Sequence, residues 1–251
     1  MALRLGDIDA DARYDAWSQV VERIKREQVN QAWSHYMFRL LRAVFTTNPS
    51  LSEKGGFIFE WMVDNYVDAA LMLIRRELDV QSGTENLKNL LLDLIEHPMV
   101  VTRARYLSRW EKENPAKEDP ANRWLADRTF DRFNPIRVEG NSDADYIDPD
   151  MVRADLDQLD ASADHLRKYA ERTRAHRTPE LSLDTAEMTF KALHDAIADV
   201  QVVVKKYYRL LTLGSLVRWE PVPQYDTLEA FTKPWIVDRA AVKKASKDSA
   251  L

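Results

Sequence analysis

The sequence contains no cysteine, which excludes disulfides, thiolate metal sites and cysteine nucleophiles. Its 251 residues include only six glycines, and none of them forms a P-loop or a dinucleotide-binding fingerprint. No apolar run approaches the roughly 18 residues that a membrane span requires, and the acidic N-terminal segment lacks the apolar core of a signal peptide. We therefore expect a cytoplasmic protein without a membrane anchor.

Excess positive charge is also missing. The formal net charge is −5, whereas domains that bind nucleic acid through bulk electrostatics are usually basic. Any contact with RNA would therefore depend on a local patch. Apolar residues make up 45% of the chain, which is enough for a chain of this length to bury a substantial core.

Apolar residues recur at three- and four-residue steps through most of the chain, a pattern typical of amphipathic helices. The pattern predicts an all-α fold, a bundle of five or six long helices without a sheet. The expected helices are 15–45, 53–78, 82 or 84–97, 100–110, 151–177 and 183–213. Gly214 is the expected C-cap of the last helix. The side chains expected to be deeply buried are Trp61, Leu73, Leu159, Leu166, Ile197 and Val204.

Residues 111–149 interrupt this pattern with four prolines and many Asp and Asn residues. We interpret them as a loop-rich insertion that carries one short helix at 122–133. The bundle domain then spans 1–213, and 214–251 form a C-terminal extension with a basic tail.

Residues 139–164 contain nine acidic side chains and one arginine. The favoured interpretation is a solvated loop and helix start, because acidic residues suit the positive end of a helix dipole. A less favoured alternative is a small-molecule enzyme in which these carboxylates hold a divalent metal. No HExxH or ExxH pair predicts a metal site, and the five histidines are scattered along the chain.

A group of polar side chains follows the apolar stripe of the helix predicted at 151–177. Gln158, His165, Tyr169, Arg172 and His176 fall within about 60° of one another at 100° per residue. Imidazole, phenol and guanidinium groups together can bind a phosphodiester and move its protons. The alternative is a hydrated helix face without a function.

Residues 166–177, which read LRKYAERTRAHR, resemble the signature helix of the AbiU-type abortive-infection proteins of the HEPN superfamily, in which LRKYRNKxxAHR is typical. Residues 61–79 and 87–92 resemble the second and third helices of the same family. The resemblance extends over about two thirds of the chain, from the first helix to Leu213.

This resemblance implies a dimeric helical bundle of a prokaryotic defence or toxin–antitoxin system. Many of its members are metal-independent ribonucleases that use an arginine and a histidine, without a cofactor. His176 matches the family histidine, whereas Ala170 stands where the family arginine is expected. Arg172, one turn before His176, or Arg167 would have to substitute for it, or the site is inactive. The expected catalytic pair is Arg172 and His176, with Tyr169, His165 and Arg167 as the expected RNA-binding residues.

Two functional hypotheses follow. The first is a ribonuclease-like effector with a shifted Arg172/His176 pair at a dimer interface. The second is a non-catalytic bundle that binds a partner protein or RNA, which is favoured by the apolar pattern that Ala170 continues.

Overall fold

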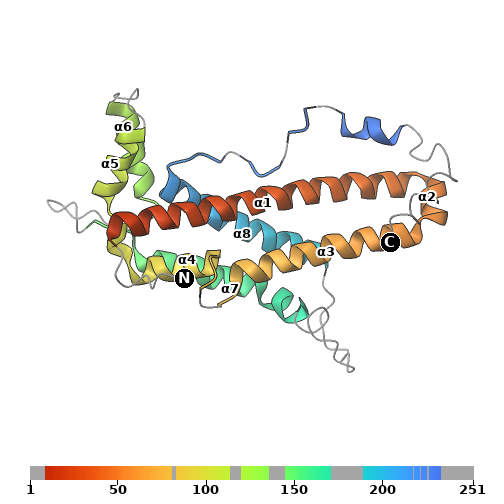
Figure 1. Cartoon of the computed structure of the whole chain (residues 1–251), viewed down its shortest axis with the longest axis horizontal. Coiled ribbons are helices and arrows are strands. Elements are labelled where there is room, and N and C mark those ends of the chain that lie inside the picture. Colours follow the sequence, from red (N-terminus) through yellow and green to blue (C-terminus); the bar gives the residue numbers. More distant parts are fainter. Residues whose placement is uncertain are drawn as a thin grey trace, which may run out of the picture.

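The computed structural model describes residues 9–80, 83–113, 120–135, 145–170, 189–216, 218–220, 222–224 and 226–232. These residues form an elongated all-α bundle, as the sequence predicts (Figure 1). Its elements are α1 (Ala10–Thr47), α2 (Pro49–Lys54), α3 (Gly56–Leu78), α4 (Leu87–Glu96), η2 (Pro98–Val100), α5 (Arg103–Glu113), α6 (Pro120–Phe130), α7 (Pro149–Ala170), α8 (Phe190–Thr212) and η4 (Thr227–Phe231).

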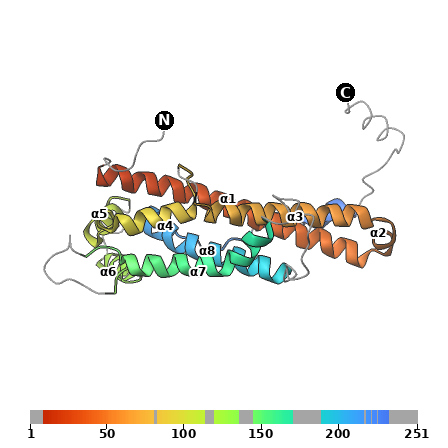
Figure 2. The ribbon, with the colours of Figure 1, turned by 90° about the horizontal axis from the view of Figure 1, so that it is seen from below.

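Helix α1 runs the length of the molecule, and α3, α4, α7 and α8 pack along it or along one another (Figure 2). Helices α5 and α6 lie together at one end of the molecule (Figure 1). In the part of the chain that the structure describes, β pairing is limited to one isolated bridge between Thr102 and Tyr146. None of the described helices is both long and apolar enough to cross a membrane.

Local capping explains several boundaries that periodicity places only approximately. Asn48 ends α1 and caps α2, because its side chain accepts hydrogen bonds from the Ser50 and Leu51 amides while Pro49 occupies the first helical position. Gly55 separates α2 from α3, so the helix predicted from 53 begins at Gly56. A Cβ at Gly55 would lie 2.6 Å from the Leu51 carbonyl oxygen, which explains the glycine.

The next two helices also begin later than expected. Helix α4 is capped by Asn86, whose side chain accepts a hydrogen bond from the Asn89 amide, and not by the predicted Thr84. The Thr84 hydroxyl instead lies within hydrogen-bonding distance of the Asn86 and Asn89 side-chain amides. The following helix begins at Arg103 because η2 occupies the three residues after His97.

The predicted C-cap at Gly214 is wrong by one residue. Leu213 takes the left-handed conformation that ends α8, with a φ of 57°. Gly214 is needed for another reason, because a Cβ there would lie 2.7 Å from the Tyr208 ring. The glycine therefore allows the chain to pass close to the aromatic ring as it leaves the bundle.

Five of the six predicted core residues are buried: Leu73, Leu159, Leu166, Ile197 and Val204. The sixth prediction is wrong, because Trp61 is 61% exposed. Helix α3 is apolar on most sides in this part, so the periodicity does not determine which side faces the bundle. Phe57 and Ile58, one turn earlier, are exposed as well.

Candidate functional site: a histidine pocket

The site predicted on the helix at 151–177 lies mostly outside the described part of the chain. Arg172 and His176 follow the last described residue of α7, and the side chains of His165, Arg167 and Ala170 are not among those described. Tyr169 is half-buried and packs against the core. The arrangement of these residues around a phosphate therefore stays a prediction.

The described carboxylates of the acidic stretch are largely engaged by basic residues. Asp155 accepts hydrogen bonds from Lys206 and Tyr207, and Asp160 accepts from Lys88. Asp145 is buried and pairs with Arg103. These contacts join α7 and the segment before it to neighbouring helices, a structural role for these acidic residues.

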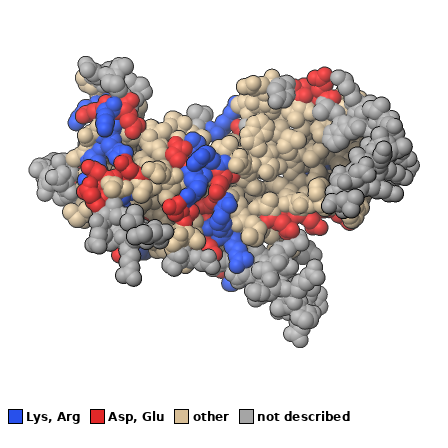
Figure 3. All heavy atoms as spheres, viewed as in Figure 1, with Lys and Arg blue, Asp and Glu red and all other residues tan. Residues whose placement is uncertain are grey.

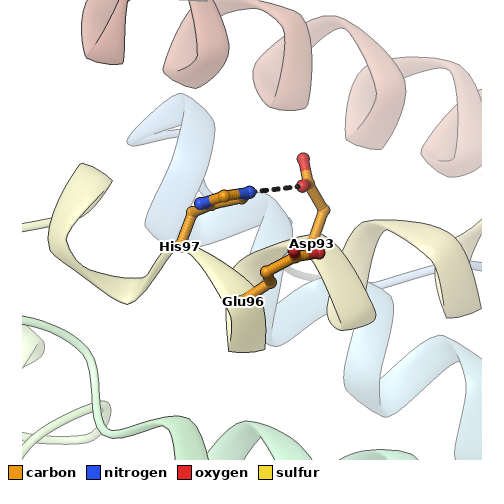
Figure 4. Close-up of side chains that lie close together, drawn as sticks. All are labelled: Asp93, Glu96 and His97. Atoms are coloured by element: carbon orange, nitrogen blue, oxygen red, sulfur yellow. Dashed lines mark ion pairs between the residues drawn. The ribbon is translucent and has the colours of Figure 1, made fainter. Parts of the chain in front are cut away.

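Asp93, Glu96 and His97 form a compact group at the end of α4 (Figure 4). Their nearest ligand atoms lie within 4.8 Å of one another, as a metal site would require. However, Arg13 Nη1 lies 2.7 Å from Asp93 Oδ1, and Trp17 Nε1 lies 2.6 Å from Asp93 Oδ2. A cation would compete with both donors, so we interpret Asp93 as an anchor for α1.

Within the described residues, two histidines from different helices lie together: His35 on α1 and His194 on α8. The imidazole rings of His35 and His194 are stacked, with centroids 4.2 Å apart and an interplanar angle of 18°. The Tyr66 hydroxyl of α3 lies 2.9 Å from His194 Nε2, a hydrogen bond between the two side chains. Phe38 stacks on Tyr66 at 4.2 Å and holds the phenol in place.

The two imidazoles line a cavity of about 200 Å³ between α1 and α8. Trp219 and Glu220, from the segment after α8, form part of its wall. Arg39 also lines the cavity, 3.5 Å from Glu220, and both of these side chains are mostly exposed. The remaining lining residues are Gln31, Ala32, Tyr36, Ile197, Ala198 and Gln201.

Burial and positive charge both favour the neutral form of the histidines. Burial lowers the pKa of His35 below its ordinary value of 6.5, and His194 and Arg39 lower it further, against the opposing effect of Glu220. Burial also lowers the pKa of His194; Asp195 opposes this shift, and Arg39 and Arg42 add to it. Both imidazoles are therefore neutral near pH 7, in a field set partly by guanidinium groups.

Tyr66 stays protonated over the same pH range, because burial raises its pKa to about 12. Its hydroxyl can therefore donate to His194 Nε2. A neutral His194 would then carry its proton on Nδ1. The hydrogen bond to the phenol orients one member of the pair.

Buried amides continue the polar surface along α1. Gln31 is 6% exposed, and its Nε2 has no hydrogen-bond partner among the described residues. Gln28 is fully buried, and within the same residues neither its Oε1 nor its Nε2 has a partner. Buried polar atoms are normally hydrogen-bonded to protein, water or a ligand. Because these amides lack a protein partner among the described residues, we expect a water molecule or a ligand beside them.

Sequence reasoning missed this pocket because its histidines come from helices far apart in the chain. His35 follows Gln31 by one helical turn, and His194 lies within the apolar stripe between Leu193 and Ile197. A histidine inside such a stripe is a weak sign of a buried polar site. Only the packing of α1 against α8 brings the two rings together (Figure 2).

Searches against family models, curated proteins and solved structures found no match to this chain.

Proposed function

We propose that the protein binds a phosphate ester in the histidine pocket and acts there as an RNA-directed, metal-independent phosphodiesterase. The observation that carries this proposal is the stacked His35–His194 pair with the Tyr66 hydroxyl on one ring. Imidazole, phenol and guanidinium are the groups that the sequence led us to expect around a phosphate. The two imidazoles and Arg39 line one cavity, and the Tyr66 hydroxyl is hydrogen-bonded to one of the rings.

Two adjacent imidazoles suit the proton transfers of RNA cleavage. One neutral histidine accepts the proton of the ribose 2′-hydroxyl as its oxygen attacks phosphorus. The other, protonated when the anionic substrate binds, gives its proton to the departing 5′-oxygen. The products are a 2′,3′-cyclic phosphate and a 5′-hydroxyl. Because one histidine gains the proton that the other loses, no external oxidant, reductant or water is consumed in this step.

The charges around the pocket are mixed: Arg39 is paired with Glu220 at the cavity wall, and the positive charge that an anionic ligand would use comes from Arg39 together with Arg42. Arg39 and Arg42 act on His194, and Arg39 also acts on His35, each favouring the neutral imidazole. A bound phosphate would offset these guanidinium groups and raise the pKa of both rings. Arg39 at the cavity wall is placed to stabilise negative charge that develops on the phosphate.

Cleavage of a mixed RNA pool in EDTA tests the proposal with wild type, His35→Asn, His194→Asn and His97→Asn. Because acid–base catalysis typically contributes about 10²–10⁴-fold, each pocket variant should lose detectable cleavage. His97→Asn is the matched control, since His97 lies on α4 outside the pocket and should leave activity unchanged. A wild type that cleaves nothing would contradict the catalytic part of the proposal.

The variant His176→Ala separates this pocket from the site that the family resemblance implies. Loss of cleavage in His176→Ala, with full activity in both pocket variants, would assign the chemistry to His176 and Arg172 instead of the pocket. The assignment to a prokaryotic defence or toxin–antitoxin system rests only on the resemblance of residues 166–177, 61–79 and 87–92.

A second candidate function, a bundle that binds a protein partner, is favoured by an exposed apolar surface on α3. Phe57, Ile58 and Trp61 are between 56% and 81% exposed. Figure 3 shows few charged residues over the described surface between the middle of the molecule and the grey atoms on the right, where α1 and α3 run. Apolar surfaces of this kind often mark interfaces.

The α3 surface also suits the homodimer that the family resemblance implies. The apolar residues of α8 are buried within the chain, so a dimer would use Phe57, Ile58 and Trp61. Light scattering at micromolar concentration tests this: a 29 kDa monomer contradicts the dimer, and Trp61→Glu should dissociate one that forms.

A further inference from the structure

Arg39 and Glu220 are the charged residues that line the histidine pocket in the described part of the chain. They come from different elements, α1 and the segment after α8, and Arg39 Nη1 lies 3.5 Å from Glu220 Oε1. With both histidines neutral, the opposite charges of this pair offset each other at the cavity wall. The lining therefore combines one cation with one anion and carries no surplus of positive charge.

Contacts on both sides of Glu220 along the chain hold the carboxylate beside α1. Trp219, the preceding residue, packs against the hydrophobic core and lines the same cavity. Further along, the hydroxyl groups of Tyr36 and Thr227 are 3.3 Å apart, and the segment after α8 lies along α1 (Figure 1). Glu220 is thereby kept beside the guanidinium that the proposed function assigns to the phosphate.

The negative charge of Glu220 also reaches the imidazole of His35. It opposes the lowering of the His35 pKa that burial, His194 and Arg39 cause. A phosphate beside this ring would lie in the field of the same carboxylate. Because Coulomb energy is proportional to the charge of the ligand, the repulsion is twice as strong for a doubly charged phosphate as for a singly charged one.

We propose that Glu220 sets the charge preference of the histidine pocket, which takes a singly charged phosphodiester in preference to a doubly charged phosphate monoester. This inference rests on the proposed function, because it assigns the substrate class of the same site. Glu220 offsets the attraction of Arg39 for a second negative charge, and a dianion loses more hydration when it enters the cavity. Glu220 is then a specificity-determining residue that directs the pocket to phosphates within an RNA chain.

The size of the pocket agrees with a ligand of this kind. A cavity of about 200 Å³ has the space of roughly six water molecules, enough for a phosphate group with small substituents. Dimethyl phosphate and methyl phosphate are two such probes of similar size. At pH 8 the first carries one negative charge and the second about two, because the second pKa of a phosphate monoester is about 6.

NMR titration of the histidine ring protons with these two esters at pH 8 tests the inference. Wild type should bind dimethyl phosphate more tightly than methyl phosphate. In Glu220→Gln the affinity for dimethyl phosphate should rise about threefold and that for methyl phosphate about tenfold, because the repulsion that is lost scales with the charge of the ligand.

Glu85→Gln is the matched control, since Glu85 also pairs with an arginine of α1, Arg23, but does not line the pocket. It should leave both affinities unchanged. A pH titration without ligand adds a second readout, because the pKa of His35 should be lower in Glu220→Gln than in wild type. An unchanged pKa would show that Glu220 is not beside the ring and would overturn the inference.

The remaining outcomes separate this inference from the proposed function. Tighter binding of methyl phosphate by wild type, or equal changes of the two affinities in Glu220→Gln, would overturn the charge preference and leave the phosphate site in place. Failure of both esters to shift either histidine resonance at millimolar concentration would overturn the proposed function as well.

Discussion

Glu77 is a buried carboxyl group whose titration should control the stability of the bundle near neutral pH. It is 1% exposed on α3, and its Oε2 accepts a hydrogen bond of 3.1 Å from the Leu87 amide at the start of α4. Burial raises the pKa of Glu77 from 4.5 to about 7; the Leu87 hydrogen bond and Arg76 oppose this shift, whereas Glu27 adds to it.

A carboxyl group with a raised pKa in the folded state binds its proton more tightly there than in the unfolded chain. Its contribution to stability is therefore complete below pH 4.5 and is lost as the pH rises through 7. The difference between the two pKa values corresponds to a loss of about 3 kcal/mol in the free energy of unfolding.

Glu77→Gln should remove this pH dependence. The glutamine keeps an acceptor for the Leu87 amide, and its NH₂ group can donate to Glu27 as the protonated carboxyl does. The variant should therefore gain about 3 kcal/mol relative to wild type between pH 4.5 and pH 8. Urea unfolding followed by tryptophan fluorescence at several pH values in this range measures the difference.

Glu85→Gln is the matched control, because Glu85 pairs with Arg23 at the surface. Its stability relative to wild type should change little over the same pH range. If the difference between Glu77→Gln and wild type is constant over this range, or equals that of the control, the burial argument for Glu77 is wrong.

Three further predictions concern packing and charge. Leu159→Ala should lower the free energy of unfolding by about 2–5 kcal/mol in a urea titration, because Leu159 is fully buried; a loss below 1 kcal/mol would contradict this. Trp61→Ala should cost less than about 1 kcal/mol in the same assay, since Trp61 is mostly exposed; a loss as large as that of Leu159→Ala would show that this surface is covered. Arg103→Met should cost about 3–5 kcal/mol, because buried Asp145 loses its ion pair and Asp127 and Asp131 each lose one of their partners; the melting temperature at pH 7 reports it, and an unchanged value would contradict a structural role for this cluster.

The sequence predicts the helices because each one buries an apolar stripe. The stripe at Leu159 and Leu166 is buried as expected, and the same holds for Ile197 and Val204 on α8. The error at Trp61 has a physical cause: an apolar residue on a helix that is apolar on most sides has no defined inward direction. Neighbouring helices decide that direction, and their positions are not contained in the local pattern.

Helix ends and the candidate site depend on contacts that local sequence does not specify. Leu213 takes the left-handed conformation expected of Gly214, whereas the glycine is required for its close approach to the Tyr208 ring. Likewise, the stacking of His35 on His194 depends on the register between α1 and α8. Periodicity places each histidine on a helix but does not give that register.

The central claim is that His35 and His194 form an anion-responsive pair, and NMR titration of the histidine ring protons tests it most directly. Both resonances should titrate below pH 6.5 in the free protein, because burial and nearby guanidinium groups lower the two pKa values. Addition of inorganic phosphate should raise both pKa values and leave the His97 ring resonances unshifted. Titration of both rings at their ordinary value, with no response to phosphate, would contradict the account.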